Sequence, residues 1–350
     1  MPAPIVSALV RNAPDSFVLP DLLTLSSGMQ HAVASNPHYD AAAAQSRAWI
    51  VSHDVLSERK LAVFGKGDFE RLASRAFPYA GPDELRTLCD FVNVLFVIDE
   101  ATDSQNGVDA QHTADTCMRA LEDPSWDDGS ALAQIMHEFR ARLRPIGGNA
   151  LRRFIQHFGS YLGYVVEEAT NRERGAILGL KEYQALRREN SGCRPYYALI
   201  EYALGIDLPE AVYENKHFSR FYWASVDMAC YANDVYSYAA EYAQGLDDCN
   251  VVTVLMHAKG LSLQATSDYI GAYYEKLLQR YTAAKAALLA TSFGDPAVDA
   301  DVARYAHAMD YWPMGNLVWS FETKRYFGDK HVQVFETLSV PLKHPKPRSP

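Results

Sequence analysis

The 350-residue sequence lacks the features that define several protein classes. Its five cysteines are odd in number and include no CxxC pair, which argues against a disulfide framework and a structural zinc site. No Lys/Arg run accompanies the formal net charge of −10, so nucleic acid is not an expected partner. No apolar run approaches the roughly 20 residues that span a bilayer, and prolines interrupt the N-terminus before a signal-like stretch develops. These absences predict a cytoplasmic protein without stable membrane insertion.

Alternating β patterns beside Asn-Gly or Asp-Gly turns are also missing, whereas apolar residues recur at three-to-four spacing over long segments. No internal repeat or change of composition marks a domain boundary. The sequence therefore predicts a single all-α domain over residues 1–340, followed by a disordered tail at 341–350. The expected helices include 83–100, 130–146, 151–173 and 269–290, and the expected loops are 104–112, 122–130 and 291–299.

Residues 231–241, YANDVYSYAAE, place three polar side chains in an aromatic and apolar region. Helical residues advance about 100° each, so Asn233, Ser237 and Glu241 share a stripe roughly 80° wide. An amide carbonyl, a hydroxyl and a carboxylate are hard oxygen ligands of the kind that Mg²⁺ accepts. The alternative is that these polar residues simply face solvent. The apolar segments on both sides of the stripe disfavour that alternative.

A second polar cluster ends the apolar run FVNVLFVIDEATD, residues 91–103. Asp99 and Asp103 share a helix face at i and i+4, where like charges repel. A cation between the carboxylates, or open solvent, must relieve that repulsion. Taken alone, the cluster is better explained as a solvated helix end. Together, the two clusters suggest a diphosphate bridged by metal ions at the mouth of an apolar pocket.

These residues resemble class I terpene synthases, of the fungal (basidiomycete-type) sesquiterpene synthase group. DEATD (99–103) is similar to the aspartate-rich motif of that family. Residues 233–241 match its NSE motif, N-D-x-x-S-x-x-x-E, in full. By average composition, chance would produce the four fixed positions in roughly one chain of this length in several hundred. The implied fold is a single-domain class I terpenoid synthase helical bundle.

By the same resemblance, Asp99, Asn233, Ser237 and Glu241 would be metal ligands, with Asp103 a weaker candidate. ALRRENSG (185–192) is similar to the family's diphosphate sensor followed by a helix break. Arg188 would be the sensor, with Arg187 as a competitor, Ser191 the linker and Gly192 the effector. The pair Arg325 and Tyr326 would bind the diphosphate.

Three positions depart from the family pattern, and one of them is Ser191, at a linker position that is often Asp. Glu100 stands where many relatives have Asp, so Asp99 is the ligand carried over from this motif. Ala240 stands where the family often has a basic residue that reaches the diphosphate, and Lys324 or Arg187 could replace that contact.

The resemblance implies about three Mg²⁺ ions and a small prenyl diphosphate substrate, most simply farnesyl diphosphate. Leaving-group departure would produce a carbocation that needs a dry, aromatic surface. Phe96, one turn before Asp99, and Trp319, six residues before Arg325, are the candidate pocket residues. The group resemblance hints at 1,11-closure toward a humulyl cation and protoilludene-type products.

Two alternatives to a cyclase remain open at this point. A chain-elongating prenyl transferase would need a second aspartate-rich motif, which LDDCN (246–250) does not supply. A helical scaffold or isoprenoid-binding protein without turnover would not need an intact NSE motif. Both a monomer and a homodimer are compatible with the sequence.

Overall fold

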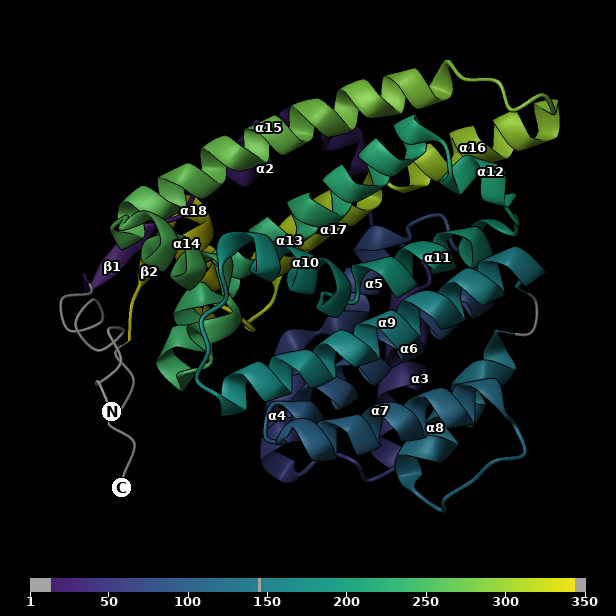
Figure 1. The fold of residues 1–350 in the computed structure, drawn as a ribbon, viewed down its shortest axis with the longest axis horizontal. Helices are drawn as coiled ribbons and strands as arrows, with labels where there is room; N and C mark the ends of the chain where they lie inside the picture. Colours follow the sequence, from purple (N-terminus) through teal and green to yellow (C-terminus); the bar gives the residue numbers. More distant parts are fainter. Residues whose placement is uncertain (1–13, 144–145, 344–350) are drawn as a thin grey trace.

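The computed structural model describes residues 14–143 and 146–343, and long helices form nearly all of its regular structure (Figure 1). The predicted all-α class is confirmed, and each of the four long helices expected from periodicity is present. None of the helices in these two ranges has the length and apolarity needed to cross a bilayer. The α-helices are α2 (Leu22–Leu25), α3 (Tyr39–Ser52), α4 (Glu58–Gly67), α5 (Phe69–Ala76), α6 (Pro82–Thr102), α7 (Gly107–Glu122), α8 (Ala131–Arg142), α9 (Gly148–Glu173), α10 (Leu180–Asn190), α11 (Cys193–Leu204), α12 (Glu210–Tyr213), α13 (Lys216–Gln244), α14 (Val251–Lys259), α15 (Leu263–Leu289), α16 (Pro296–Ala308), α17 (Tyr311–Glu322) and α18 (His331–Thr337).

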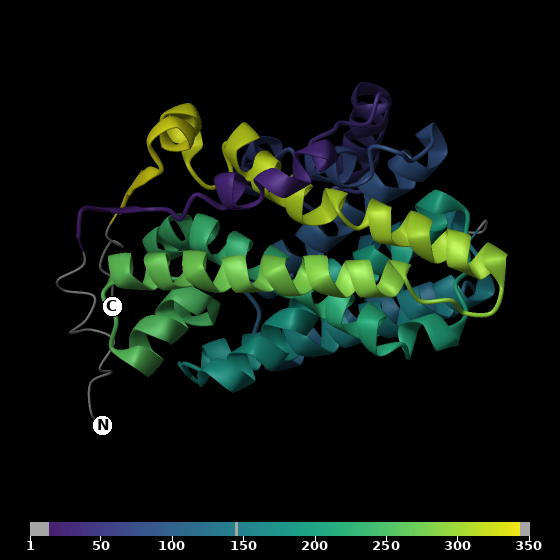
Figure 2. The same cartoon turned by 90° about the horizontal axis from the view of Figure 1, so that it is seen from above.

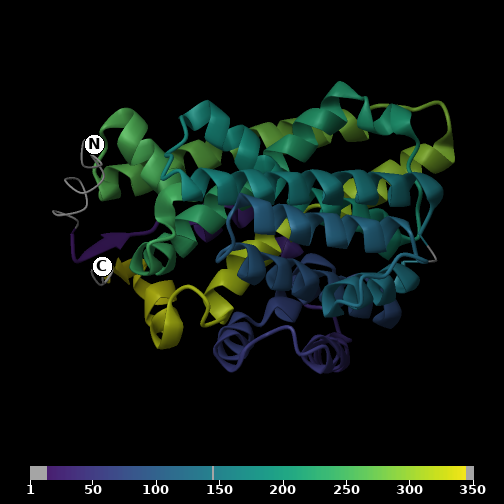
Figure 3. The same ribbon diagram turned by 60° about the horizontal axis from the view of Figure 1, so that its bottom comes forward.

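Helix α13 lies at the centre of the bundle. It packs along α15 and α17 and also contacts α10 and α14 (Figures 1 and 2). Buried residues occur on every side of α13 between Phe221 and Tyr242, as expected for a helix surrounded by protein. On the side of the bundle away from α15, helices α6, α7, α8 and α9 lie next to one another (Figures 1 and 3). The polar face of α13 is therefore inside the bundle.

A helix break separates α10 from α11, as predicted from Gly192. Gly192 has φ +71°, a left-handed conformation that side chains other than glycine rarely adopt. A Cβ atom at this position would also lie 3.0 Å from Leu95 Cδ1 on α6. Ser191 ends α10, and its hydroxyl accepts a hydrogen bond from the amide of Cys193 at 3.3 Å. The break therefore packs against α6 just before its acidic end.

A short antiparallel sheet joins the two ends of the described chain. β1 (Ser16–Val18) pairs with β2 (Ser339–Pro341), and the amide of Leu342 donates to the carbonyl of Asp15 at 2.8 Å. No β pattern in the sequence had predicted these strands. The expected tail at 341–350 thus includes residues that pair with the N-terminal segment, and 344–350 lie outside the described residues.

The predicted loop at 104–112 is wrong over most of its length, because α7 begins at Gly107. The side chain of Asn106 accepts hydrogen bonds from the amides of Val108 and Asp109, both at 2.9 Å. Asn106-Gly107 is therefore an N-cap and first helical residue rather than a turn. The loops expected at 122–130 and 291–299 are present in part, as residues 123–130 before α8 and 291–295 before α16.

Candidate active site

The polar stripe of α13 faces the interior near the end of the helix. Ser237 is buried, while Asn233 and Glu241 are partly buried. Burial raises the pKa of Glu241 to about 7, although hydrogen bonds from Ser237 and Asn250 oppose the shift. The Asn250 amide donates to Glu241 Oε2 at 2.9 Å. Glu241 therefore has neutral hydrogen-bond donors, and no described Lys or Arg forms a salt bridge with it.

Asp234, the remaining fixed residue of the motif, has a structural role. Its buried carboxylate accepts from Arg187 Nε at 2.8 Å and from the amide of Val251 at 3.1 Å. The Tyr183 hydroxyl also donates to it. These contacts tie α13 to α10 and to the start of α14. They explain why Asp234 lies beside the polar stripe of α13 without belonging to it.

The acidic end of α6 shows the like-charge repulsion that its spacing predicts. Burial and then the charge of Asp99 raise the pKa of Asp103 to about 8, against the nearby Arg172. Asp99 itself is exposed. Glu100 Oε2 lies 4.0 Å from Lys60 Nζ, so this carboxylate is directed to α4 rather than to α13.

Arg325 and Tyr326, which follow α17, connect the two clusters. Asn233 Nδ2 donates to the Tyr326 hydroxyl at 2.7 Å. Burial opposes the charge of Arg325, but Tyr326 and the carboxylates of Asp99 and Glu100 raise its pKa. The pair thus reaches the stripe of α13 on one side and the acidic end of α6 on the other. The structure therefore joins Asn233 to Tyr326 by a hydrogen bond and places the neighbouring Arg325 within the electrostatic reach of Asp99.

Of the two sensor candidates, Arg187 rather than Arg188 reaches the stripe. Arg187 Nη2 donates to Asn233 Oδ1 at 2.7 Å. Arg188 instead forms two hydrogen bonds to Asp227, at 2.6 and 2.7 Å, and lies over the ring of Trp223. Arg187 is therefore the candidate whose guanidinium contacts the stripe, and the sensor role of either arginine stays a prediction. The two side chains differ because neighbours on a helix point about 100° apart.

Aromatic rings surround the guanidinium of Arg325. Its central carbon lies 4.8 Å from the centre of Phe69 and 5.9 Å from that of Phe96. Phe96 in turn contacts Phe69 and Phe64, with ring centres 4.7 and 5.3 Å away. Trp319 packs against Phe69 and Tyr326, and its indole N–H donates to the carbonyls of Gly67 and Asp68 at 3.0 Å.

Sequence reasoning missed several residues of this region. Phe64 and Phe69 come from α4 and α5, where no motif distinguishes them from core residues. Glu168 belongs to no motif. Asn190 lies within ALRRENSG, but the resemblance gave it no role. Lys324, considered as a replacement for the basic residue absent at position 240, is paired with Asp329 at 2.7 Å.

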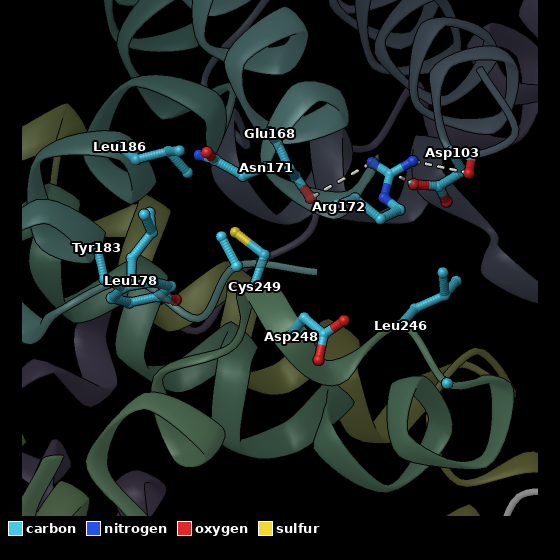
Figure 4. A pocket seen from close by; sticks show the side chains of 12 residues that line it. Asp103, Glu168, Asn171, Arg172, Leu178, Tyr183, Leu186, Leu246, Asp248 and Cys249 are labelled. Atoms are coloured by element: carbon cyan, nitrogen blue, oxygen red, sulfur yellow. Dashed lines mark hydrogen bonds and ion pairs between the residues drawn. The ribbon is translucent and has the colours of Figure 1, made fainter. Parts of the chain in front are cut away.

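A pocket lies between the end of α6 and the end of α13 (Figure 4). It contains about 500 Å³ of empty space, its open mouth included. Asp103, Glu168 and Arg172 form a polar side, and Arg172 stands between the two carboxylates (Figure 4). Leu178, Leu186 and Leu246 are among the apolar lining residues. Of the two clusters, only Asp103 lines this space, and Asp99, Asn233, Ser237 and Glu241 are not among its lining residues.

Oxygen atoms of mixed type, rather than a carboxylate cluster, characterise the candidate site. In the described ranges, no group of three or more His, Cys, Asp or Glu residues could hold a metal ion. The stripe of α13 is a different kind of group, because two of its three members are Asn and Ser. Its residues fit a hard divalent cation, since a partly buried carboxylate without a salt-bridge partner stands beside amide and hydroxyl oxygens.

The chain is similar to known proteins over nearly its whole length. Residues 90–280 match the family described as terpene synthase family 2, C-terminal metal binding. A Coprinopsis cinerea protein named linoleate 10R-lipoxygenase COP4 is 48% identical over 336 residues, covering 95% of both chains. Bifunctional terpene synthase Agr4 of Cyclocybe aegerita is 45% identical, covering 94% of both. Viridiflorene synthase Agr2 of the same species is 37% identical, covering 94% of this chain and 87% of its own.

Solved structures share the fold at lower identity. An a-eudesmol synthase superposes with a TM-score of 0.74 at 20% identity, covering 83% of this chain and 96% of its own. Germacradien-4-ol synthase from Streptomyces citricolor has a TM-score of 0.73 at 21% identity, with the same coverage of both chains. At these identities the likeness shows a common fold, and the helical bundle described above is that fold.

Proposed function

Since this chain belongs to the terpene synthase family, we propose that it is a magnesium-dependent sesquiterpene synthase that ionises farnesyl diphosphate and cyclises the resulting cation. One observation carries the proposal. Asn233 on α13 is hydrogen-bonded to Tyr326, whose neighbour Arg325 lies within the electrostatic reach of Asp99 and Glu100. Residues from three parts of the chain thus supply oxygen atoms suited to a divalent ion and donors suited to an anion, which supports the proposal.

The proposed metal ligands are Asn233, Ser237 and Glu241 on one side and Asp99 on the other, with Asp103 as a further candidate. When bound, divalent ions would neutralise the charge that develops on the departing diphosphate. The carboxylates of Glu241 and Asp103 support this role. Both have raised pKa values because burial disfavours their charged forms and the neighbouring residues do not fully offset it. A bound divalent cation would favour the charged form of each.

Arg187, Arg325 and Tyr326 are the proposed diphosphate-binding residues. Guanidinium groups suit this task because their planar fork can donate two hydrogen bonds to phosphate oxygens. Arg187 currently donates to Asn233 Oδ1, the atom proposed as a metal ligand. Diphosphate binding would draw this guanidinium away from the amide oxygen. Arrival of the anion would thereby free a metal ligand in the same step.

Phe64, Phe69, Phe96 and Trp319 form the proposed pocket wall behind Arg325. Aromatic faces stabilise a cation by up to about 2 kcal/mol each when water is excluded. All four side chains are buried, which suits a surface that must keep a carbocation from water. The proposed cyclisation is 1,11-closure toward a protoilludene-type skeleton, which follows from the group resemblance and not from pocket shape.

The test is an incubation of purified protein with Mg²⁺ and farnesyl diphosphate, followed by headspace gas chromatography. We expect a volatile cyclic sesquiterpene that disappears when EDTA replaces Mg²⁺. A longer prenyl diphosphate would instead indicate a chain-elongating transferase. Isoprenoid binding without product would indicate a scaffold. The activity in the name of the Coprinopsis relative is checked by oxygen uptake with linoleate, where we expect no uptake.

A further inference from the structure

Glu168 on α9 lies between the acidic end of α6 and the helix that carries Arg187. Its Oε2 accepts a hydrogen bond from Asn190 Nδ2 at 2.6 Å. Its Oε1 lies 3.8 Å from Arg172 Nη2. Figure 4 shows this carboxylate at the edge of the pocket, pointing toward Arg172. One side chain therefore contacts two residues that belong to different parts of the site.

The contact with Asn190 continues to the stripe of α13. Asn190 Oδ1 accepts from Arg187 Nη1 at 3.4 Å, and Arg187 Nη2 donates to Asn233 Oδ1 at 2.7 Å. Glu168 thus orients the Asn190 amide with its oxygen toward the guanidinium. Without the carboxylate, nothing in this chain of contacts would hold that amide in the same orientation.

The contact with Arg172 continues to the end of α6. Arg172 Nη1 donates to the carbonyls of Thr102 and Asp103, at 3.0 and 2.7 Å. Free carbonyls at a helix end favour a positive group nearby. Arg172 therefore binds the last turn of the helix that carries Asp99, and Glu168 lies beside its guanidinium.

The Glu168 carboxylate lies where its surroundings disfavour its charged form. Burial and the charge of Asp99 raise the pKa of Glu168, whereas Arg172, Arg187 and Asn190 oppose that shift. A residue that only filled space would not need a charge between two arginines. Its exposed neighbour Glu167 is one residue away on the same helix and serves as a natural comparison.

We propose that Glu168 is a positioning residue that holds the Arg187 guanidinium and the end of α6 in register for binding of the metal–diphosphate group. The inference rests on the proposed function, because it assigns Arg187 and Asp99 to that group. Glu168 acts through Asn190 on one side and through Arg172 on the other. It contacts neither the prenyl chain nor the reacting carbon.

The first test compares Glu168→Ala and Glu168→Gln with wild type and with the control Glu167→Ala. Isothermal titration with inorganic diphosphate and Mg²⁺ measures affinity without turnover, and kcat and KM are measured with farnesyl diphosphate. Residues that orient a ligand typically contribute about 10–100-fold in affinity, so we expect a loss of that size in Glu168→Ala. Glu168→Gln, which keeps an oxygen for Asn190, should recover part of it, and Glu167→Ala should match wild type.

A double-mutant cycle with Asn190→Ala tests the route of the effect. Because Glu168 acts on Arg187 through Asn190, the double variant should bind diphosphate only slightly more weakly than Glu168→Ala. The inference would be overturned if the loss of affinity in the double variant equalled the product of the losses in the two single variants. Wild-type affinity in Glu168→Ala would also overturn it. Circular dichroism melting accompanies each variant, and a fall in Tm without a change in affinity would reduce Glu168 to a structural residue. Absence of product from wild type would instead refute the proposed function.

Discussion

A buried ion pair and the partly buried carboxylates at the pocket end differ in how completely they are hydrogen-bonded. Between α9 and α11, Arg153 and Glu201 form a bidentate ion pair with hydrogen bonds of 2.8 to 3.2 Å. The amide of Leu208 and the hydroxyl of Tyr213 also donate to the Glu201 carboxylate, at 2.6 and 2.8 Å. Arg153 in turn donates to the carbonyl of Leu208 at 2.7 Å. Each oxygen of this carboxylate has more than one partner.

At the pocket end, the carboxylates are less completely paired. Glu241 has hydrogen bonds from neutral side chains, and burial raises its pKa to about 7. Asp103 lies 3.7 Å from Arg172, yet burial and Asp99 raise its pKa to about 8. Burial also raises the pKa of Glu201, but Arg153 opposes it directly. The fully paired group ties helices together, whereas the underpaired group can gain stability from a bound cation.

The largest expected effect is on folding, at the fully paired group. Arg153→Met should lower the free energy of unfolding by about 3–5 kcal/mol, because it leaves the Glu201 carboxylate buried without its charge partner. Urea denaturation monitored by circular dichroism measures this change. Sesquiterpene formation well below the melting temperature should persist. A loss below about 1 kcal/mol would mean that the two regions do not differ as described.

The second-largest expected effect is on catalytic turnover, at the incompletely paired residues of the pocket end. Asn233→Ala and Asp99→Asn should each reduce kcat/KM by at least ~100-fold, since each removes a proposed metal ligand worth several kcal/mol in the transition state. The helical circular dichroism spectrum should not change. Product analysis by gas chromatography gives the rate. Wild-type activity in either variant would remove the metal assignment.

A smaller effect concerns pH dependence without metal. In EDTA, Asp103 and Glu241 keep protons in the folded chain at pH values where the unfolded chain has lost them. The folded state therefore binds more protons, so its stability should fall as pH rises from 5 to 8, on the order of 1–2 kcal/mol after allowing for exposure.

Urea denaturation at several pH values measures this slope. The double variant Asp103→Asn with Glu241→Gln should show a flatter dependence, because neither replacement titrates. Mg²⁺ together with inorganic diphosphate should stabilise wild type most at pH 8, where the carboxylates are charged. An identical slope in the double variant would show that these two groups do not cause it.

The smallest effect is on the pocket wall. Phe96→Leu keeps an apolar side chain of similar bulk but removes the aromatic face near Arg325. We expect a five- to tenfold fall in kcat, about 1 kcal/mol, with a changed ratio of products. Phe139→Leu, a core change near Phe91 and Phe154, is the matched control and should leave the product ratio unchanged. Equal product ratios in both variants would argue against a cation-stabilising role for Phe96.

The helical class and the positions of both clusters were predictable from local spacing. Residues four apart share a helix face in any bundle, so the sequence alone predicts that Asn233, Ser237 and Glu241 form a stripe. The helix break at Gly192 was also predictable from the sequence, because it depends on the backbone conformation of one residue. The β1–β2 pair was not, because three-residue strands carry too little pattern and their pairing joins opposite ends of the chain.

The sequence by itself determined which residues share a helix face, because that depends on a backbone period of 3.6 residues. Only the tertiary structure decided that Arg187 rather than Arg188 reaches Asn233, and that Glu168 lies beside Arg172 and Asn190. Those contacts depend on how α9, α10 and α13 are rotated and spaced against one another. Packing of the whole core sets that rotation, and no short segment encodes it.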